Sequence, residues 1–212
     1  MDNFVNSLPS KNNIKATYES YKPILSQIMA RIEERLKKTI KLSSNPTYKS
    51  RVKSFNSYYR KVLRLKSEEA EKNSFVELTD MMGIRVICAF LEDLSEVEQQ
   101  IKANFVVKEV EYKGAQQSFR EFGYESVHVL VSIPKDCMPE QCELPLPETL
   151  VCEIQIRTIL QDAWAEVEHE LIYKSEFTPF DMPLRRKLAS MNASLTLADI
   201  IFQEIRDYQK KL

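Results

Sequence analysis

The stretch from Leu150 to Lys174 constrains the fold of this chain more than any other. Its first part alternates apolar and polar side chains, with Cys152, Ile154 and Ile156 on one face of a strand and Glu153, Gln155 and Arg157 on the other. Three different functional groups side by side indicate a site rather than a solvated face. From Thr158 the apolar residues recur at helical spacing, so we expect a helix that packs on the sheet.

Length and composition indicate one α/β or α+β domain over residues 1–212, and we expect the α+β form, with a mixed β-sheet flanked by helices. With 212 residues and 43% hydrophobic content, the chain can bury one substantial core. We divide it into an N-terminal helical region at 1–48, a core at 49–174 and a C-terminal helix at 175–212. The sequence contains no apolar run long enough to span a bilayer, and its first residues lack the pattern of a signal peptide. We therefore expect a cytoplasmic protein that does not bind membranes.

Charge, glycine and cysteine counts exclude several classes of site. Lys plus Arg number 30 and Asp plus Glu 31, which does not favour a general nucleic-acid binder. The glycines Gly83, Gly114 and Gly123 cannot form a P-loop or a dinucleotide-binding turn, so any phosphate has to be bound by cationic side chains. Four cysteines and two histidines fit reduced thiols better than a disulfide or zinc framework.

Hydrophobic periodicity predicts the order of the elements. We expect helices over Thr17–Lys41, from about Ser54, over Ser74–Met82 and over Glu92–Asn104, and strands over Gly83–Leu91, Phe105–Tyr112 and from Gly123 onward. The last helix carries an apolar seam at alternating steps of four and three residues, which predicts packing against another helix. We favour the first helix of the same chain over another subunit as its partner. The members of this seam are Leu184, Leu188, Met191, Leu195, Ala198, Phe202 and Ile205.

Cations gather in the part of the sequence that precedes the first buried strand. Lys53, Ser57 and Lys61 recur every four residues and form a ridge on one helix face. A solvated basic face is the ordinary alternative. Arg85 lies inside an apolar strand, where an unpaired charge is costly, so it should reach a cavity or an anion.

Two carboxylates at strand-associated positions, Asp80 and Glu153, would form an oxygen site for Mg²⁺ if their strands are neighbours. Together with Arg51 and the ridge, they suit a metal-bound polyphosphate. The competing interpretation is that Asp80 caps a turn and Glu153 pairs with Arg157. The sequence contains neither HExxH nor an HD dipeptide, which excludes the zinc hydrolases and the HD phosphohydrolases.

Four segments together resemble the RelA/SpoT-type alarmone synthetases, specifically their small single-domain forms. They are RVKSFNSYYRK at 51–61, DMMGIRVI at 80–87, GYESVH at 123–128 and EIQIRTILQDAWAEVEHELIYK at 153–174. The resemblance implies a nucleotidyltransferase-like synthetase fold and the transfer of the β,γ-pyrophosphate of ATP to the 3′-hydroxyl of GDP or GTP. The products would be ppGpp or pppGpp and AMP. It also implies Mg²⁺ as cofactor, a homo-oligomer, often a tetramer formed through terminal helices, and a chain without hydrolase and regulatory domains that only synthesises.

The resemblance assigns a role to each matching residue. Arg51 and Arg85 would sandwich the adenine, and Lys53, Ser57 and Lys61 would hold the ATP phosphates. Asp80 and Glu153 would bind Mg²⁺, with Glu153 also taking the proton of the 3′-hydroxyl. Tyr124, His128 and Gln155 would bind the acceptor nucleotide.

The approach to the acceptor motif departs from the family, because Phe122 stands where an Asn is usual and EYKGAQQSFREF replaces a lysine-rich segment. This departure leaves a second interpretation, in which the same pyrophosphate moves to an adenine nucleotide or to the 3′ end of tRNA. A nucleotide-binding regulator without catalysis and a helical interaction module are the remaining alternatives.

Overall fold

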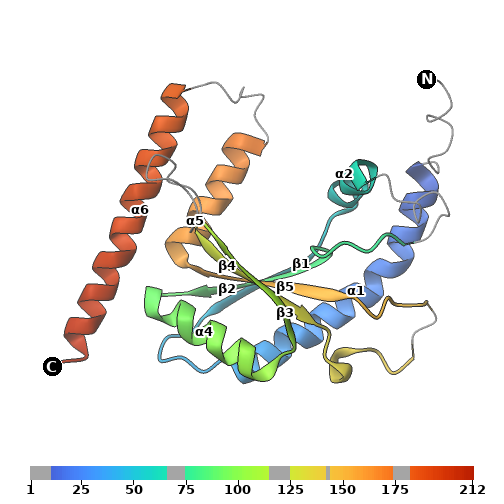
Figure 1. The fold of residues 1–212 in the computed structure, drawn as a ribbon, viewed down its shortest axis with the longest axis horizontal. Helices are drawn as coiled ribbons and strands as arrows, with labels where there is room; N and C mark the ends of the chain where they lie inside the picture. Colours follow the sequence, from blue (N-terminus) through green and yellow to red (C-terminus); the bar gives the residue numbers. More distant parts are fainter. Residues whose placement is uncertain (1–10, 66–74, 115–124, 142–143, 174–181) are drawn as a thin grey trace.

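The computed structural model describes residues 11–65, 75–114, 125–141, 144–173 and 182–212. One mixed sheet of five strands forms its centre, in the order β1-β2-β5-β4-β3 (Figure 1). β2 and β5 are parallel, whereas the other neighbouring pairs are antiparallel. The predicted α+β fold is therefore confirmed. The strands are β1 (Thr47–Val52), β2 (Met82–Cys88), β3 (Val107–Lys113), β4 (Ser126–Ser132) and β5 (Val151–Thr158).

Helices of very different length surround the sheet. They are α1 (Lys11–Thr39), α2 (Phe55–Leu65), α4 (Leu91–Asn104), α5 (Ile159–Glu168) and α6 (Met182–Gln209), with a 3₁₀ turn at Lys135–Cys137 and a π-helical turn at His169–Tyr173. α1 and α4 pack on the sheet, while α2 and the pair α5 and α6 rise on two sides of its other face (Figure 1).

The apolar alternation of β5 forms the centre of the core. Cys152, Ile154 and Ile156 are fully buried, as are Ile84 and Val129 on the neighbouring strands. α1 covers this face with a continuous buried stripe, which the spacing of its apolar residues predicts. The described cysteines Cys88, Cys137 and Cys152 are buried and free, as expected from the composition.

The opposite face of the sheet carries polar side chains in cross-strand rows. Arg51 is registered with Gly83, which is registered with Glu153. The adjacent row runs from Lys49 through Arg85 and Gln155 to His128. Because residues in register lie side by side on one face, the sheet brings together groups that are more than 100 positions apart in sequence.

The helix predicted over Ser74–Met82 is wrong for its described part. Residues 75–78 have no regular structure, a turn follows at 79–80, and Met82 already begins β2. Phe75, Val76, Leu78 and Met81 are nevertheless buried. Their apolar character reflects packing beneath α1 and α2 rather than a helical period.

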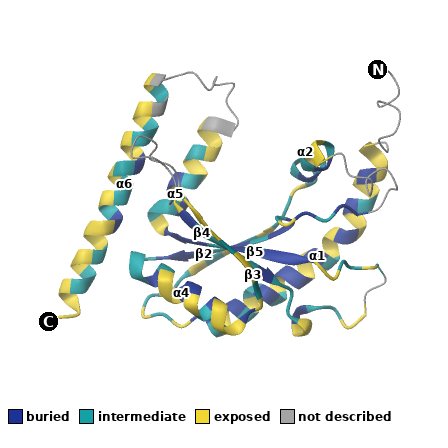
Figure 2. Ribbon diagram, in the orientation of Figure 1, coloured by how far each residue is buried: buried dark blue, intermediate teal, exposed yellow. Residues whose placement is uncertain are grey.

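The expected partner of the C-terminal helix is also wrong. α6 packs against α5 and α4, and it does so through polar residues: Arg206 Nη1 lies 2.7 Å from Asp93 Oδ1, and Asp199 accepts a hydrogen bond from Thr158 Oγ1 at 2.6 Å. The seam residues Met191, Phe202 and Ile205 are 56%, 48% and 52% exposed. Figure 2 shows that α6 is largely exposed. The predicted C-terminal helix is present, but it does not pack against the first helix.

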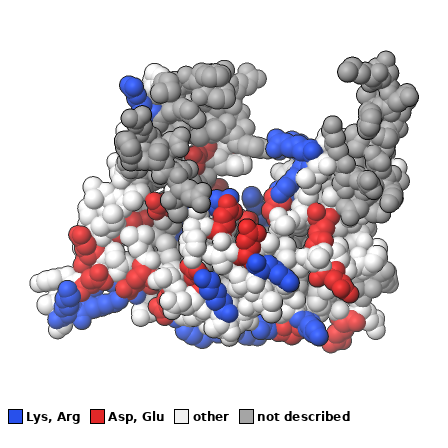
Figure 3. Space-filling model, in the orientation of Figure 1, with Lys and Arg blue, Asp and Glu red and all other residues white. Residues whose placement is uncertain are grey.

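Two surface properties complete the description. No helix in the described ranges is both long and apolar enough to cross a membrane. Acidic and basic side chains are intermixed on the face that Figure 3 presents, as expected from 30 cationic and 31 anionic residues.

Candidate active site

The polar face of the sheet forms the floor of a cavity of about 290 Å³. Strands β1, β2 and β5 contribute most of its lining, and α5 contributes one side chain. Gly83 lies between Arg51 and Glu153 in one of the two rows, and a Cβ atom built on it would meet nothing within 4 Å, so open space lies above it. The lining residues are Lys49, Ser50, Arg51, Lys53, Asp80, Gly83, Arg85, Glu153, Gln155 and Glu166.

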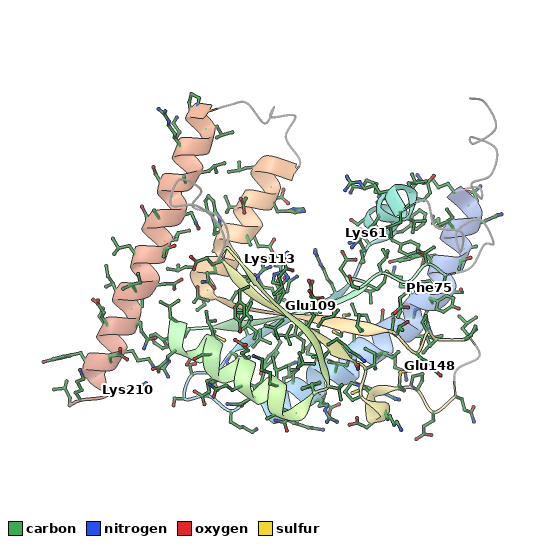
Figure 4. All side chains as sticks on the ribbon, in the orientation of Figure 1. Lys61, Phe75, Glu109, Lys113, Glu148 and Lys210 are labelled. Carbon is green, nitrogen blue, oxygen red and sulfur yellow. The ribbon has the colours of Figure 1, made fainter. Side chains whose placement is uncertain are left out.

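At one end of the cavity, two lysines hold the carboxylate of Asp80. Lys53 Nζ donates to Oδ2 at 2.7 Å, and Lys61 Nζ lies 2.9 Å from Oδ1. Lys61 extends from α2 toward the space over the sheet (Figure 4). The backbone fixes Lys53, because its N–H donates to Met81 O at 2.8 Å and its carbonyl accepts from Tyr18 at 2.6 Å. Burial raises the pKa of Asp80, but the two lysines outweigh it and the net shift is downward.

Glu153 lines the cavity from β5, the central strand of the sheet. His128 Nδ1 lies 2.9 Å from its Oε1, and Gln155 Nε2 donates to its Oε2 at 2.7 Å. Burial and the charge of Asp80 raise the pKa of Glu153, whereas the contacts with His128 and Gln155 lower it, and the net shift is downward. Glu153 is therefore ionised at neutral pH, and its carboxylate interacts electrostatically with that of Asp80.

Gln155 links Glu153 to a buried ionic cluster around Arg157. Arg157 donates to Gln155 Oε1 at 2.5 Å and to Ser126 Oγ at 3.2 Å, and its Nη1 lies 3.5 Å from Asp162 Oδ1. Burial and the nearby charge of Arg85 lower the pKa of Arg157 to about 10, against the opposing effect of Asp162. Arg157 remains charged at neutral pH.

Asp162, in the first turn of α5, forms ion pairs with three cationic side chains. Lys49 Nζ donates to Oδ2 at 2.7 Å, and Arg85 Nη1 lies 3.2 Å from Oδ1, next to Arg157. Thr158 begins the helix with a capping box, in which its Oγ1 accepts from Gln161 N at 3.0 Å. The strand-to-helix junction thus fixes the position of Asp162.

The carboxylates of the cavity fit Mg²⁺. Asp80 and Glu153 are both ionised and line the same space, and Mg²⁺ binds through one or two carboxylates with waters and substrate phosphates as its other ligands. Within the described residues, no group of three or more His, Cys, Asp or Glu side chains could hold a metal without such additional ligands.

Comparison with known proteins identifies the family. The model for the region found in RelA and SpoT proteins matches residues 50–178, more than half of the chain. The chain belongs to the RelA/SpoT family. The resemblance found in the sequence is thereby confirmed.

Two curated relatives of this RelA/SpoT chain come from Bacillus subtilis strain 168. The GTP pyrophosphokinase YwaC is 35% identical over 126 residues, and the GTP pyrophosphokinase YjbM is 31% identical over 118 residues. The matches cover 59% and 55% of this chain. They span 57% and 53% of the relatives, so the chain matches just over half of their length.

A solved structure extends the likeness to the fold. The small alarmone synthetase 1 of Bacillus subtilis superposes with a TM-score of 0.65 at 24% identity, over 95% of this chain and 96% of that one. The same synthetase has been solved with its product pppGpp and with AMPCPP. At this level of identity the superposition establishes a common fold.

The structure brings most of the predicted site residues of this RelA/SpoT domain together. Six of them line the cavity directly: Arg51, Lys53, Asp80, Arg85, Glu153 and Gln155. Lys61 and His128 do not line the cavity themselves, but Lys61 contacts the lining residue Asp80 and His128 contacts the lining residue Glu153. Ser57 lies one turn before Lys61 on α2, with its Oγ 3.1 Å from Ser54 Oγ. Tyr124 lies outside the described residues, as do Phe122 and Gly123.

Three charged residues of the site were missed by the sequence analysis: Lys49 and Glu166, which line the cavity, and Asp162, which pairs with Lys49 and Arg85. Asp162 and Glu166 stand four residues apart on α5, so they share a helix face that points back over β2. An acidic pair at this spacing usually lies on a solvent-exposed helix face. The signal that could have identified this pair is its position on the helix that directly follows the strand of Glu153 and Gln155. The alternative pairing of Glu153 with Arg157 is wrong, because Gln155, Ser126 and Asp162 bind Arg157 instead.

Proposed function

We propose that this chain is a GTP pyrophosphokinase that transfers the β,γ-pyrophosphate of ATP to the 3′-hydroxyl of GDP or GTP. The observation that carries this proposal is that Asp80 and Glu153 line one cavity together with Arg51, Lys53 and Arg85. Membership of the RelA/SpoT family and the names of both curated relatives support it. The AMPCPP-bound and pppGpp-bound forms of the structural neighbour agree with a donor and an acceptor nucleotide.

The two ends of the cavity suit the two parts of ATP. Lys53 and Lys61, with Ser57 beside them on α2, offer cations and a hydroxyl to the phosphates. Arg51 and Arg85 offer planar guanidinium groups that stack on a base and still act as cations. The Asp162 and Glu166 carboxylates bind Arg85 by its edge, since guanidinium hydrogen bonds lie in the plane of the group, and this leaves its faces for stacking.

The chemistry follows from the position of Glu153. Its carboxylate would accept the proton of the acceptor 3′-hydroxyl as the oxygen forms a bond to the β-phosphorus. The bond between the β-phosphorus and the oxygen bridging to the α-phosphorus breaks, and AMP leaves. His128 and Gln155 contact the two carboxylate oxygens of Glu153 and thereby orient the carboxylate. Because both residues are proposed to bind the acceptor nucleotide, Glu153 lies next to the proposed acceptor subsite.

Asp80 and Glu153 would hold Mg²⁺, which when bound offsets the negative charge of the phosphates. The lysines then stabilise the charge that develops on the transferred group. Tyr124, which we propose as the stacking partner of the acceptor base, completes the acceptor subsite.

Labelled ATP tests the proposal directly. Purified protein with Mg²⁺ is incubated with ATP labelled at the α- or γ-phosphorus and, separately, with GDP, GTP, ADP or deacylated tRNA. We expect equimolar AMP and a γ-labelled product that depends on GDP or GTP, and its loss in Glu153→Gln. Release of ADP, or label transfer to ADP or tRNA alone, would overturn the assignment of the acceptor. Nucleotide binding without AMP would instead indicate a regulator.

We also infer that the chain assembles with copies of itself through α6, the tetramer of small synthetases being the expected form. The seam residues Met191, Phe202 and Ile205 are exposed on α6, and contiguous exposed apolar patches mark interaction sites. Because ATP and guanine nucleotides are its proposed substrates, we assign the protein to the cytoplasm.

A further inference from the structure

The carboxylate of Glu166 lines the cavity but has no part in the proposed reaction. Asp80, Glu153 and Glu166 are the carboxylates among the described lining residues, and the first two are assigned to the metal and the proton. Glu166 lies on the last turn of α5 and contacts Arg85 through Oε1. It therefore belongs to the end of the cavity proposed to receive the donor base, not to the end where the lysines hold Asp80.

Glu166 differs from Asp162, the other carboxylate that binds Arg85. The side chain of Asp162 is 6% exposed and is shared among Lys49, Arg85 and Arg157, which identifies it as a structural anchor. The side chain of Glu166 is 53% exposed, so it faces the open cavity. A carboxylate has lone pairs for about four donors, so a contact through Oε1 leaves capacity for a ligand.

The chemistry of purines at position 6 gives this carboxylate a selective role. Adenine carries an amino group there, which donates hydrogen bonds, whereas guanine carries a carbonyl, which accepts them. The contact with Arg85 lowers the pKa of Glu166, so the group is an ionised acceptor at neutral pH. An ionised acceptor attracts the amino group and repels the carbonyl.

We propose that Glu166 accepts a hydrogen bond from the 6-amino group of the donor base and thereby selects ATP over GTP as pyrophosphate donor. This inference rests on the proposed function. It answers a requirement of that function, because an enzyme that accepts GTP at one subsite has to exclude it from the other. Stacking between Arg51 and Arg85 cannot supply the distinction, since both purines offer a similar face.

Donor analogues separate this role from a purely structural one. With GDP as fixed acceptor, kcat/KM is measured for ATP, for purine riboside triphosphate, which lacks the 6-amino group, and for GTP. We expect the parent protein to prefer ATP over purine riboside triphosphate by about 10- to 100-fold, as for a hydrogen bond to a charged group. In Glu166→Ala this preference should fall to within about threefold. Glu166→Gln should narrow the preference against GTP, because its amide also donates.

The controls distinguish the outcomes. Glu148→Gln makes the same change at an exposed position that does not line the cavity, and it should leave every ratio unchanged (Figure 4). If Glu166 only positions Arg85, its variants lower kcat/KM for all three donors by one common factor, and the proposal is overturned. A parent protein that treats ATP and purine riboside triphosphate alike overturns it without any variant. If no donor turns over, the proposed function fails, and the same ratios measured by displacement of a fluorescent ATP analogue still decide the role of Glu166.

Discussion

Replacing Asp162 by Asn should destabilise the protein far more than the loss of an ordinary surface ion pair. The change keeps the size of the side chain but removes the charge that faces Lys49, Arg85 and Arg157. The Asp162 and Arg157 side chains are 6% and 5% exposed, so the substitution would leave Arg157 buried beside Arg85 without this carboxylate. The native state would then hold a buried cation that has lost one of its ionic partners.

The magnitude follows from the geometry. Breaking a buried ion pair costs about 3 to 5 kcal/mol, whereas an exposed pair contributes about 1 kcal/mol or less. The separation of 3.5 Å and the hydrogen bonds that Arg157 donates to Gln155 and Ser126 point to the lower end, about 3 kcal/mol. For a chain of this size, that corresponds to a decrease in Tm of roughly 6 to 12 °C.

Urea unfolding and thermal melts measure this effect. Asp136→Asn is the matched control, because Asp136 is 64% exposed and pairs with Arg35 at the surface at 2.5 Å. Its cost should stay below about 1 kcal/mol. In an Arg157→Met background the Asp162→Asn change should cost less than in the parent, since the most buried of the three cations around Asp162 is absent there. Equal costs for the two Asp→Asn variants in the parent would refute the argument that Asp162 is an anchor.

Four further outcomes are expected. Gly83→Val should keep or raise Tm, because the added Cβ meets nothing within 4 Å, yet lower kcat/KM for ATP about 10- to 100-fold by filling the cavity. Glu153→Gln should reduce kcat about 10²- to 10⁴-fold with little change in Tm. Asp199→Asn should gain stability over the parent as the pH rises above 3.8. Ile205→Lys should convert the oligomer to smaller species in light scattering, with a change in monomer stability below about 0.5 kcal/mol.

The sign for Asp199 follows from its surroundings. Burial, with a smaller effect of Glu125, raises its pKa above the ordinary 3.8, against the hydrogen bond from Thr158. A raised pKa means that the protonated form is favoured in the folded state, so this contribution is full below pH 3.8 and is lost as the pH rises through the folded-state pKa. Asn keeps the acceptor for Thr158 without the charge. A constant difference between the two proteins across pH would contradict this reasoning.

The other three predictions fail under equally specific results. A Gly83→Val protein with unchanged ATP turnover would show that the space above Gly83 is not used by the donor. A Glu153→Gln protein with parental kcat would remove Glu153 from the chemistry. A parent protein that is monomeric at micromolar concentration would leave the α6 seam without the partner proposed for it.

The sequence predicted the sheet and much of the site because both depend on strict alternation. In β5 a period of two assigns each residue to a face, so Glu153 and Gln155 had to share a surface opposite Ile154. Register between strands was not readable in the same way. It follows from the pairing of β2 with β5, which places Gly83 beside Glu153 and Arg85 beside Gln155.

The errors arose where a local pattern does not identify its partner. The buried residues Val76 and Leu78 produce an apolar segment without helix, because tertiary contacts bury an irregular backbone there. In α6 the heptad-like seam indicated a helix partner, yet the hydrogen bond and the ion pair that anchor this helix use Asp199 and Arg206, which are not members of the seam. Periodicity shows that one face of a helix is apolar, but it does not show which segment or subunit covers that face.

The floor of the site is connected end to end. His128 contacts Glu153, Gln155 bridges Glu153 to Arg157, and Arg157 meets the Asp162 carboxylate that also binds Arg85. Each polar group is therefore fixed by its neighbour on the sheet rather than by a mobile surface, which is what preorganisation for charge stabilisation requires. A defect at Asp162 should accordingly propagate to Arg85 at the proposed base subsite and, through Arg157 and Gln155, to Glu153. The same connectivity explains how the sheet can carry charged side chains at partly buried positions. Burying a charge is costly unless the charge has an ionic or hydrogen-bonding partner, and these contacts supply such partners.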